Sequence, residues 1–302
     1  MTYAAKTSPP FSLRIFVANG DPDGLRLVER SNWNGKAVIF PRALYPAVRT
    51  RPEFQQTGVY LLLGPRTHGD GEMLYIGQCD RVRDRLENHY ARKDFWTRAV
   101  FFVAGPGHLN RAHVAFLEAH LVRLARAAKR MPLENGNSPS EPSLSEADRA
   151  DMEVFLQNIL GMLPVLGIHA FEKATADDAP GDAVALYCRG RGVEAKGYDT
   201  AKGFVVRSGS SAAADEVPSL KKHFPNVCEL RAELLGSGVL VPKGEVYELT
   251  QDYTFSSPSL ASAVVLARAS NGRVDWKDAG GKTLKEIQQA QAESAPGPEG
   301  EQ

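Results

Sequence analysis

The chain has 302 residues, which is long for a single hydrophobic core, so we expect two or three compact units. Its 43% hydrophobic and 24% charged residues are typical of an ordinary soluble globular protein. No apolar run approaches the roughly 18 residues of a membrane span, and residues 1–11 lack the apolar core of a secretory signal. The three cysteines are widely spaced and fit neither a disulfide framework nor zinc spacing, so we expect buried thiols in a reducing cytoplasm.

The net charge of zero hides a strong asymmetry along the chain. Residues 81–130 contain eleven Lys and Arg against four acids, a balance of +7. Residues 131–182 contain two basic residues against ten acids, a balance of −8. A basic block suits a polyanionic partner such as nucleic acid, although a solvated helix face is an equally good explanation on charge alone.

The first 56 residues predict a small α+β extension. Alternating residues predict strands over 12–18, 25–29 and 36–40, and a helix is expected over 43–51. Residues 19–24, between the first two strands, are rich in turn formers. This segment is too small for a confident independent domain, so we expect it to pack against the residues that come after it in the chain.

Residues 57–136 predict a compact domain in which an antiparallel sheet is flanked by helices. Strands are expected over 59–63 and 73–76, joined by a glycine-rich turn, and over 99–103. A helix over 81–90 has Asp80 in position to cap it. A longer helix over 110–130 ends before Pro132.

The rest of the chain predicts a linker, a second α+β domain and a tail. Residues 137–182 are expected to form a linker and an acidic helix that Ser145 and Asp148 cap. Short strands and a helix at 227–236 predict the second domain over 183–288. The polar composition of residues 289–302 predicts a disordered tail.

Two polar side chains of the helix over 81–90 fall on its buried side. Arg85 and His89 are four residues apart and therefore lie on one face, within about 60° of Val82. An arginine held there suits charge neutralisation on a phosphate. The structural alternatives are a surface ion pair for Arg85 and a hydrogen-bonded helix end for His89.

Glu118 lies inside the apolar stripe of the helix over 110–130, which spans an arc of about 140°. A carboxylate among apolar neighbours is costly unless it is paired or bound to a metal. A divalent cation explains its position as well as a structural ion pair does, since Mg²⁺ commonly uses only one or two carboxylates. His113 and His120 on the same helix are interpreted as ordinary surface residues.

These residues, in their order along the chain, resemble the GIY-YIG endonuclease family. That family includes phage-intron homing endonucleases, some restriction enzymes and the incision domain of the bacterial excision-repair nuclease. The resemblance covers about residues 57–136 and departs in having Val59 for the motif isoleucine and a longer loop after Tyr60. It rests on Gly58-Val59-Tyr60, Tyr75-Ile76-Gly77, Arg85, His89, Glu118 and Asn135.

The resemblance implies a metal-dependent hydrolysis of phosphodiester bonds, most naturally those of DNA, in restriction or repair. Glu118 would be the ligand of one Mg²⁺ or Mn²⁺ ion, and Arg85, His89 and Asn135 would complete the site. Either Tyr60 or Tyr75 would relay a proton from the attacking water, and spacing does not decide between the two. The alternative functions are a catalytically inactive nucleic-acid-binding protein and an interaction protein on the same scaffold.

A second resemblance lies near the C-terminus. The segments 255–263, 271–276 and 281–284 resemble a small uncharacterised domain that often trails nucleases and methyltransferases in restriction-like proteins. A helix over 259–269, a turn at Asn271-Gly272 and a core position for Trp276 are expected. The resemblance implies binding of a substrate or partner and no chemistry of its own.

Overall fold

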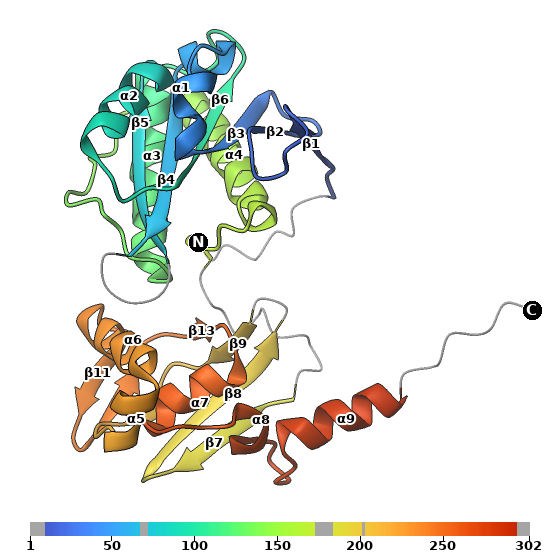
Figure 1. Cartoon of the computed structure of the whole chain (residues 1–302), viewed down its shortest axis with the longest axis vertical. Helices are drawn as coiled ribbons and strands as arrows, with labels where there is room; N and C mark the ends of the chain where they lie inside the picture. The colour runs from blue at the N-terminus through green and yellow to red at the C-terminus, as the bar shows by residue number, and fades with distance from the viewer. Residues whose placement is uncertain (1–9, 67–71, 173–183, 201–202, 295–302) are drawn as a thin grey trace, which may run out of the picture. The chain divides into compact units, whose positions relative to one another are not determined.

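The protein is described by a computed structural model that covers residues 10–66, 72–172, 184–200 and 203–294. Its contacts divide the chain into two compact units, Met1–Glu172 and Lys173–Gln302 (Figure 1). Both units mix helices with antiparallel sheets, so the predicted α+β class is confirmed. Among the described residues, no helix has both the length and the apolar composition that a bilayer span requires.

Unit 1 is built on a six-stranded sheet with the order β1-β2-β3-β6-β4-β5. Every neighbouring pair is antiparallel, and β3 pairs with β6 along its whole length. The extension predicted over 1–56 therefore shares one sheet with the residues of the predicted nuclease domain. The strands are β1 (Leu13–Val17), β2 (Arg26–Arg30), β3 (Gly35–Pro41), β4 (Gly58–Pro65), β5 (Glu72–Cys79) and β6 (Arg98–Ala104).

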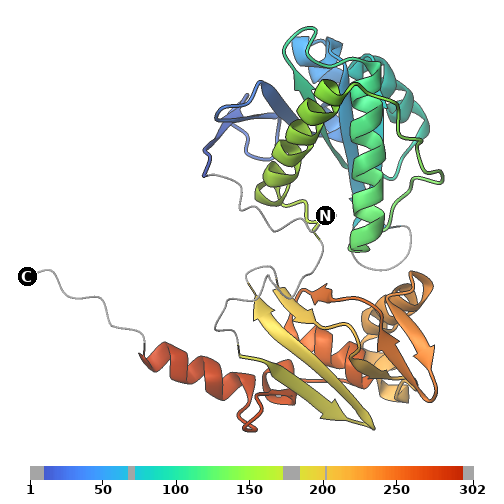
Figure 2. The ribbon, with the colours of Figure 1, turned by 180° about the vertical axis from the view of Figure 1, so that it is seen from behind.

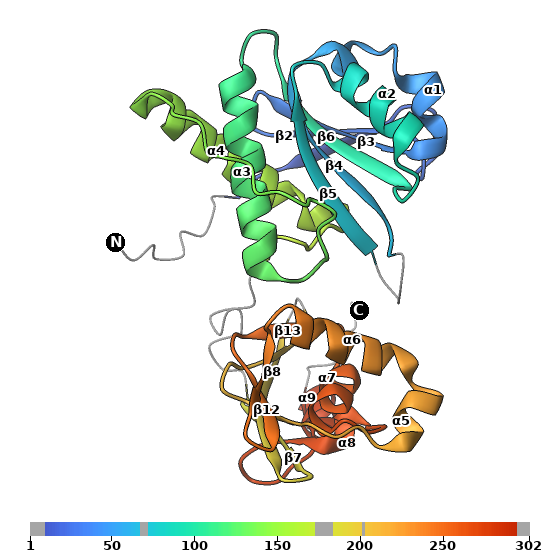
Figure 3. The same ribbon diagram turned by 90° about the vertical axis from the view of Figure 1, so that its left-hand side faces the viewer.

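Helices cover both faces of this sheet, which explains why β4 and β6 are almost continuously apolar. One core lies between the sheet and the helices α3 and α4, and a second lies on the side of α1 and α2 (Figure 3). The helices and short 3-10 segments of unit 1 are η1 (Arg42–Leu44), α1 (Tyr45–Val48), η2 (Pro52–Gln55), α2 (Val82–Arg92), α3 (Arg111–Ala128), α4 (Glu146–Met162) and η3 (Pro164–Leu166).

The helix starts differ from the expectations in two places. The cap position of α2 is Arg81, with no side-chain cap hydrogen bond, so the prediction that Asp80 caps this helix is wrong. Asp80 instead lies one residue outside the cap. At the start of α3 a capping box forms, because the Asn110 side chain accepts from the His113 backbone and the His113 ring accepts from the Asn110 backbone. The predicted Ser145 cap of α4 is confirmed.

Unit 2 contains a five-stranded sheet of order β13-β9-β8-β7-β14 and a three-stranded sheet of order β10-β12-β11. The apolar helix α7 packs against β7, β8 and β9, and Trp276 is fully buried in the same core, as the sequence predicts. The strands are β7 (Leu186–Gly190), β8 (Val193–Thr200), β9 (Gly203–Val206), β10 (Ser211–Ala213), β11 (Leu240–Lys243), β12 (Val246–Leu249), β13 (Tyr253–Phe255) and β14 (Trp276–Lys277).

The C-terminal segment departs from the predicted tail. The helices of unit 2 are α5 (Pro218–His223), α6 (Pro225–Gly236), α7 (Pro258–Leu266), α8 (Gly272–Asp275) and α9 (Leu284–Ser294). Disorder predicted from residue 289 is therefore wrong as far as Ser294, because Leu284 is buried and Ile287 packs on the core of unit 2, anchoring the helix. Residues 295–302 lie outside the described residues, as do residues 67–71 of the turn predicted between β4 and β5.

Candidate functional site

The two glycine motifs form the paired strands β4 and β5, and their register opposes Tyr60 and Gly77. A Cβ on Gly77 would lie 2.2 Å from the Tyr60 hydroxyl and 2.4 Å from its ring carbon Cζ. A Cβ on Gly58 would lie 2.6 Å from the carbonyl oxygen of Phe102 on β6. Both motif glycines are thus required by close packing within the sheet, and Gly77 leaves room for a fully buried tyrosine.

Helix α2 brings Arg85 and His89 to the hydroxyl of Tyr60. The Arg85 Nε donates to this hydroxyl at 3.3 Å, and the hydroxyl lies 2.7 Å from Nε2 of His89. Because Arg85 supplies a proton to the oxygen, the phenol can donate its own proton to an unprotonated Nε2. Val82 and Leu86 are fully buried beside them, so the apolar side of α2 fixes the direction of both polar side chains.

The ionisation states of Tyr60 and His89 are set by their burial and by the positive charge of Arg85. Burial raises the pKa of Tyr60 well above its ordinary value, although the Arg85 hydrogen bond lowers it in part. Burial, with the charges of Arg85 and Lys93, lowers the pKa of His89 to about 4. At neutral pH the cluster therefore contains a neutral phenol, a neutral imidazole and one guanidinium. That guanidinium is exposed, since Arg85 reaches solvent beyond the buried pair.

Tyr75 occupies the more open side of the same cluster. Its ring lies 5.1 Å from the His89 ring and 6.2 Å from the Tyr60 ring, measured between centroids. The ammonium of Lys93 lies 4.7 Å from the Tyr75 ring centroid, within the range of a cation–π contact. Tyr75 is partly exposed, whereas Tyr60 is fully buried. Only one of the two tyrosines is therefore open to solvent.

Glu118 lies on α3, the helix that packs against β5, and its carboxyl group is partly buried. Its neighbours Val114, Leu117 and Leu121 are fully buried, as the apolar stripe predicts. Burial raises the pKa of Glu118, and the positive charge of Arg85 acts in the opposite direction. Among the described residues the carboxylate forms no hydrogen bond or ion pair, so its only electrostatic partner there is Arg85.

Asn135 is held against the backbone of β5 beside the second motif. Its side-chain oxygen accepts from the Ile76 amide at 2.9 Å, and its side-chain nitrogen donates to the Ile76 carbonyl at 2.7 Å. Residues 132–134 pair with Leu74 in the same way, through one parallel bridge. This segment therefore covers the edge of β5 and places Asn135 next to Tyr75 and Gly77 in the strand.

The sequence reasoning missed Lys93, which the structure brings into the cluster. Its ammonium pairs with Glu134 at 2.6 Å, and this ion pair ties the end of α2 to the segment that carries Asn135. Further along the chain, Glu141 contacts α3, since it lies 3.3 Å from His120 and 3.5 Å from Arg123. His120 also stacks on Phe116, so the interpretation of His120 as an ordinary surface residue is wrong.

Two hollows of unit 1 lie away from this cluster. One of about 300 Å³ is lined by Trp33, His108, His113 and neighbouring residues of α4, and another of about 250 Å³ lies beside residues 104–107. Neither includes a residue predicted for the site.

The comparisons with known proteins concern the second unit. Residues 186–288 match a domain of unknown function (DUF4357). The predicted uncharacterised domain is therefore confirmed at these residues, whereas the comparison with protein families gave no match to the GIY-YIG family. No curated protein and no solved structure matches the chain.

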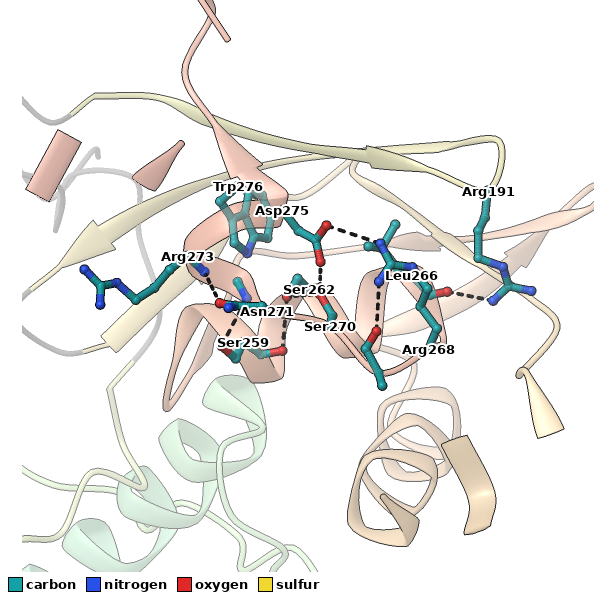
Figure 4. A network of polar contacts seen from close by, with 12 residues as sticks. Arg191, Ser259, Ser262, Leu266, Arg268, Ser270, Asn271, Arg273, Asp275 and Trp276 are labelled. Atoms are coloured by element: carbon teal, nitrogen blue, oxygen red, sulfur yellow. Dashed lines mark hydrogen bonds and ion pairs between the residues drawn. The ribbon is translucent and has the colours of Figure 1, made fainter. Parts of the chain in front are cut away.

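The DUF4357 domain has its own polar network around α7 and α8 (Figure 4). The hydroxyl of Ser270 donates to Asp275, which also pairs with Arg268 at 3.2 Å. Ser259 accepts from the Gly272 amide, and the indole of Trp276 donates to the Pro258 carbonyl at 2.9 Å. A Cβ on Gly272 would lie 2.2 Å from the Pro258 backbone. These bonds join α8 closely to α7, and each group is satisfied within the network, so we assign it a structural role.

Proposed function

We propose that unit 1 is a metal-dependent endonuclease of the GIY-YIG type that hydrolyses phosphodiester bonds of DNA. The observation that carries the proposal is that the hydroxyl of Tyr60 binds both Arg85 and His89, with the partly buried Glu118 near enough for the charge of Arg85 to act on its pKa. Arg85 is exposed and donates to the hydroxyl of the buried Tyr60. Glu118 is partly buried and forms no hydrogen bond or ion pair among the described residues. A cation for the phosphate and a ligand for a metal are what phosphodiester hydrolysis requires.

The donor chemistry of the site fits one Mg²⁺ or Mn²⁺ ion. Glu118 supplies a single hard oxygen ligand, and the described residues contain no group of three His, Cys, Asp or Glu that could form a closed site. Mg²⁺ is commonly bound by one or two carboxylates together with water and substrate oxygens. When bound, the ion would polarise the phosphate and stabilise the leaving oxygen.

Arg85 binds the phosphate and Tyr60 positions Arg85. The Tyr60 hydroxyl accepts from Nε of Arg85, and Tyr75 forms a second hydrogen bond with the guanidinium, so only part of its donors are used within the cluster and the others can face a phosphate. Tyr60 stays protonated at neutral pH because burial raises its pKa, and its hydroxyl donates a hydrogen bond to His89, so it is not available as a base. The Tyr60–His89 pair therefore orients Arg85 and takes no proton from water.

Tyr75 is the better candidate to relay the proton of the attacking water. It is the more exposed tyrosine, and the cation of Lys93 lies over its ring. Asn135 fixes the backbone of Ile76 through two hydrogen bonds, so it holds the strand position of Tyr75.

A nicking assay on supercoiled DNA tests the proposal. The full chain should convert supercoiled plasmid to nicked or linear form with Mg²⁺ or Mn²⁺ and not with chelator. Glu118→Gln and Arg85→Ala should each abolish cutting while the circular dichroism spectrum stays unchanged. The exposed Glu146 at the start of α4 offers a matched control, and Glu146→Gln should cut normally. Full metal-dependent cutting by Glu118→Gln would refute the assignment.

The same assay also distinguishes the proposed roles of Tyr60 and Tyr75. Tyr75→Phe removes the proposed proton relay and should leave a protein that still binds DNA in the presence of chelator. Tyr60→Phe removes the hydroxyl that orients Arg85, so it should weaken DNA binding as well as cutting. If Tyr75→Phe cuts at the wild-type rate, the assignment of Tyr75 fails.

A further inference from the structure

Among the described residues of unit 2, no helix covers one face of the five-stranded sheet (Figure 2). Strand alternation directs Cys188 and Ala195 toward α7 and the core, and Tyr187, Lys196 and Tyr198 to the opposite face. Figure 2 presents β7 and β8, in yellow, from the side away from α6 and α7. Tyr187, Lys196 and Tyr198 are all partly exposed there.

The exposed side chains of this face form a mixed aromatic and basic surface. Tyr187 and Lys196 oppose each other in the register of β7 and β8. The ammonium of Lys196 lies 5.9 Å from the Tyr187 ring centroid and 5.7 Å from that of Tyr198. Arg189 lies 5.1 Å from the Tyr187 centroid, and Arg207 lies 6.0 Å from that of Tyr198. Each tyrosine is thus flanked by two cations on one sheet face.

The charge of this surface is positive after its internal ion pairs are counted. Arg189 pairs with Glu194 at 2.7 Å, and Arg207 pairs with Asp252 at 3.5 Å. Lys196 has no carboxylate partner among the described residues, and a hydrogen bond with Tyr198 raises its pKa, so it stays charged. On β14, Lys277 opposes Tyr187 and adds a further exposed cation to the same face.

We propose that this face of the DUF4357 domain binds single-stranded DNA. Tyr187 and Tyr198 offer rings on which unpaired bases can stack, and the ammonium groups of Lys196 and Lys277, which form no close ion pair among the described residues, suit the phosphates between them. A flat sheet with aromatic side chains selects single strands, because bases in a duplex have no free ring face to stack on. This binding goes beyond the proposed cleavage in unit 1, and only the choice of DNA over RNA rests on that proposal.

Fluorescence anisotropy on the full chain carrying Arg85→Ala tests the binding, with chelator present, so that neither DNA binding nor metal-dependent cutting by unit 1 interferes. The probe is a labelled oligo-dT of about 16 nucleotides, the upper end of the site sizes of single-strand-binding OB folds. Tyr187→Leu and Tyr198→Leu should each weaken binding about fivefold or more, the loss expected for one stacked base. Tyr187→Phe keeps the ring and should bind like the wild type. A duplex of the same length should bind several times more weakly.

The salt dependence isolates the role of the cations. Lys196→Met should reduce the slope of log affinity against log salt by about 0.7, the value for one phosphate contact with a single strand. The matched control is Lys222→Met on the exposed side of α5, which should leave both affinity and slope unchanged. Equal binding of duplex and single strand, unchanged affinity in both Leu variants, or tighter binding of the equivalent RNA would overturn the proposal. None of these outcomes depends on whether unit 1 cuts DNA.

Discussion

Replacing Gly77 by alanine tests whether the glycine of the second motif is required to make room for Tyr60. The added Cβ would lie 2.2 Å from the Tyr60 hydroxyl, so the ring must move by about 1.2 Å to reach the 3.4 Å of an ordinary contact. The ring has no free direction, since Tyr60 is fully buried and its hydroxyl is bonded to Arg85 and His89. A displacement of this size breaks both hydrogen bonds.

The expected loss of stability comes from these contacts. Overpacking in a filled core costs about 1–3 kcal/mol, and each lost hydrogen bond costs about 0.5–1.5 kcal/mol. We therefore expect Gly77→Ala to lower the free energy of unfolding by about 2–6 kcal/mol in urea titrations. Moving Arg85 by about 1 Å should also reduce nicking about a hundredfold.

Gly136 provides the matched control, because a Cβ added there meets no atom within 4 Å and its backbone is not in the left-handed region. Gly136→Ala should therefore change neither stability nor nicking. If Gly77→Ala unfolds at the wild-type urea concentration, the tyrosine is not confined by its surroundings, and the explanation of the motif glycine is wrong.

Three further variants test the electrostatics of the chain by urea unfolding at different pH values. Burial raises the pKa of Glu118, so its ionisation opposes folding: Glu118→Gln should match the wild type below pH 4.5 and be more stable at about pH 8. Burial lowers the pKa of His89 from 6.5 to about 4, so the wild type should lose stability as the pH falls between these values, and His89→Gln should lose less. Arg231 is 1% exposed and donates to the carbonyls of Val264 and Ala213, so Arg231→Met should cost about 3–5 kcal/mol. A cost below about 1 kcal/mol would contradict that role.

Features that depend on periodicity within one element were predictable from the sequence. Leu117 and Leu121 repeat along α3, and this placed Glu118 among buried neighbours before any tertiary contact was known. The same reasoning put His89 on the buried side of α2, where it is 4% exposed, whereas Arg85 is exposed and reaches Tyr60 with its Nε. The role of Gly77 was not predictable, because it depends on the register that sets this residue opposite Tyr60 across two strands.

The start of α2 and the ion pairs between distant segments could not be predicted from the sequence. Asp80 has the residue type of a helix cap, yet α2 begins one residue later, and a shift of one position removes the cap geometry. Lys93 gave no signal because its partner, Glu134, is 41 residues away and meets it only when residues 132–135 lie along β5. Long-range contacts of this kind depend on tertiary packing, which no local pattern encodes.

The charge asymmetry of the chain has a different meaning in the folded protein. Basic residues of the segment 81–130 pair with acids of the segment 131–182, as in Arg123 with Glu141 and Arg130 with Glu172. Part of the apparent excess is therefore used to attach one segment to the other, and it is a weak argument for nucleic acid. Arg85 is different, because its hydrogen bond is to a neutral phenol and its charge is not cancelled by a close ion pair. A phosphate bound by unit 1 should therefore depend on Arg85 more than on any of the paired cations around it.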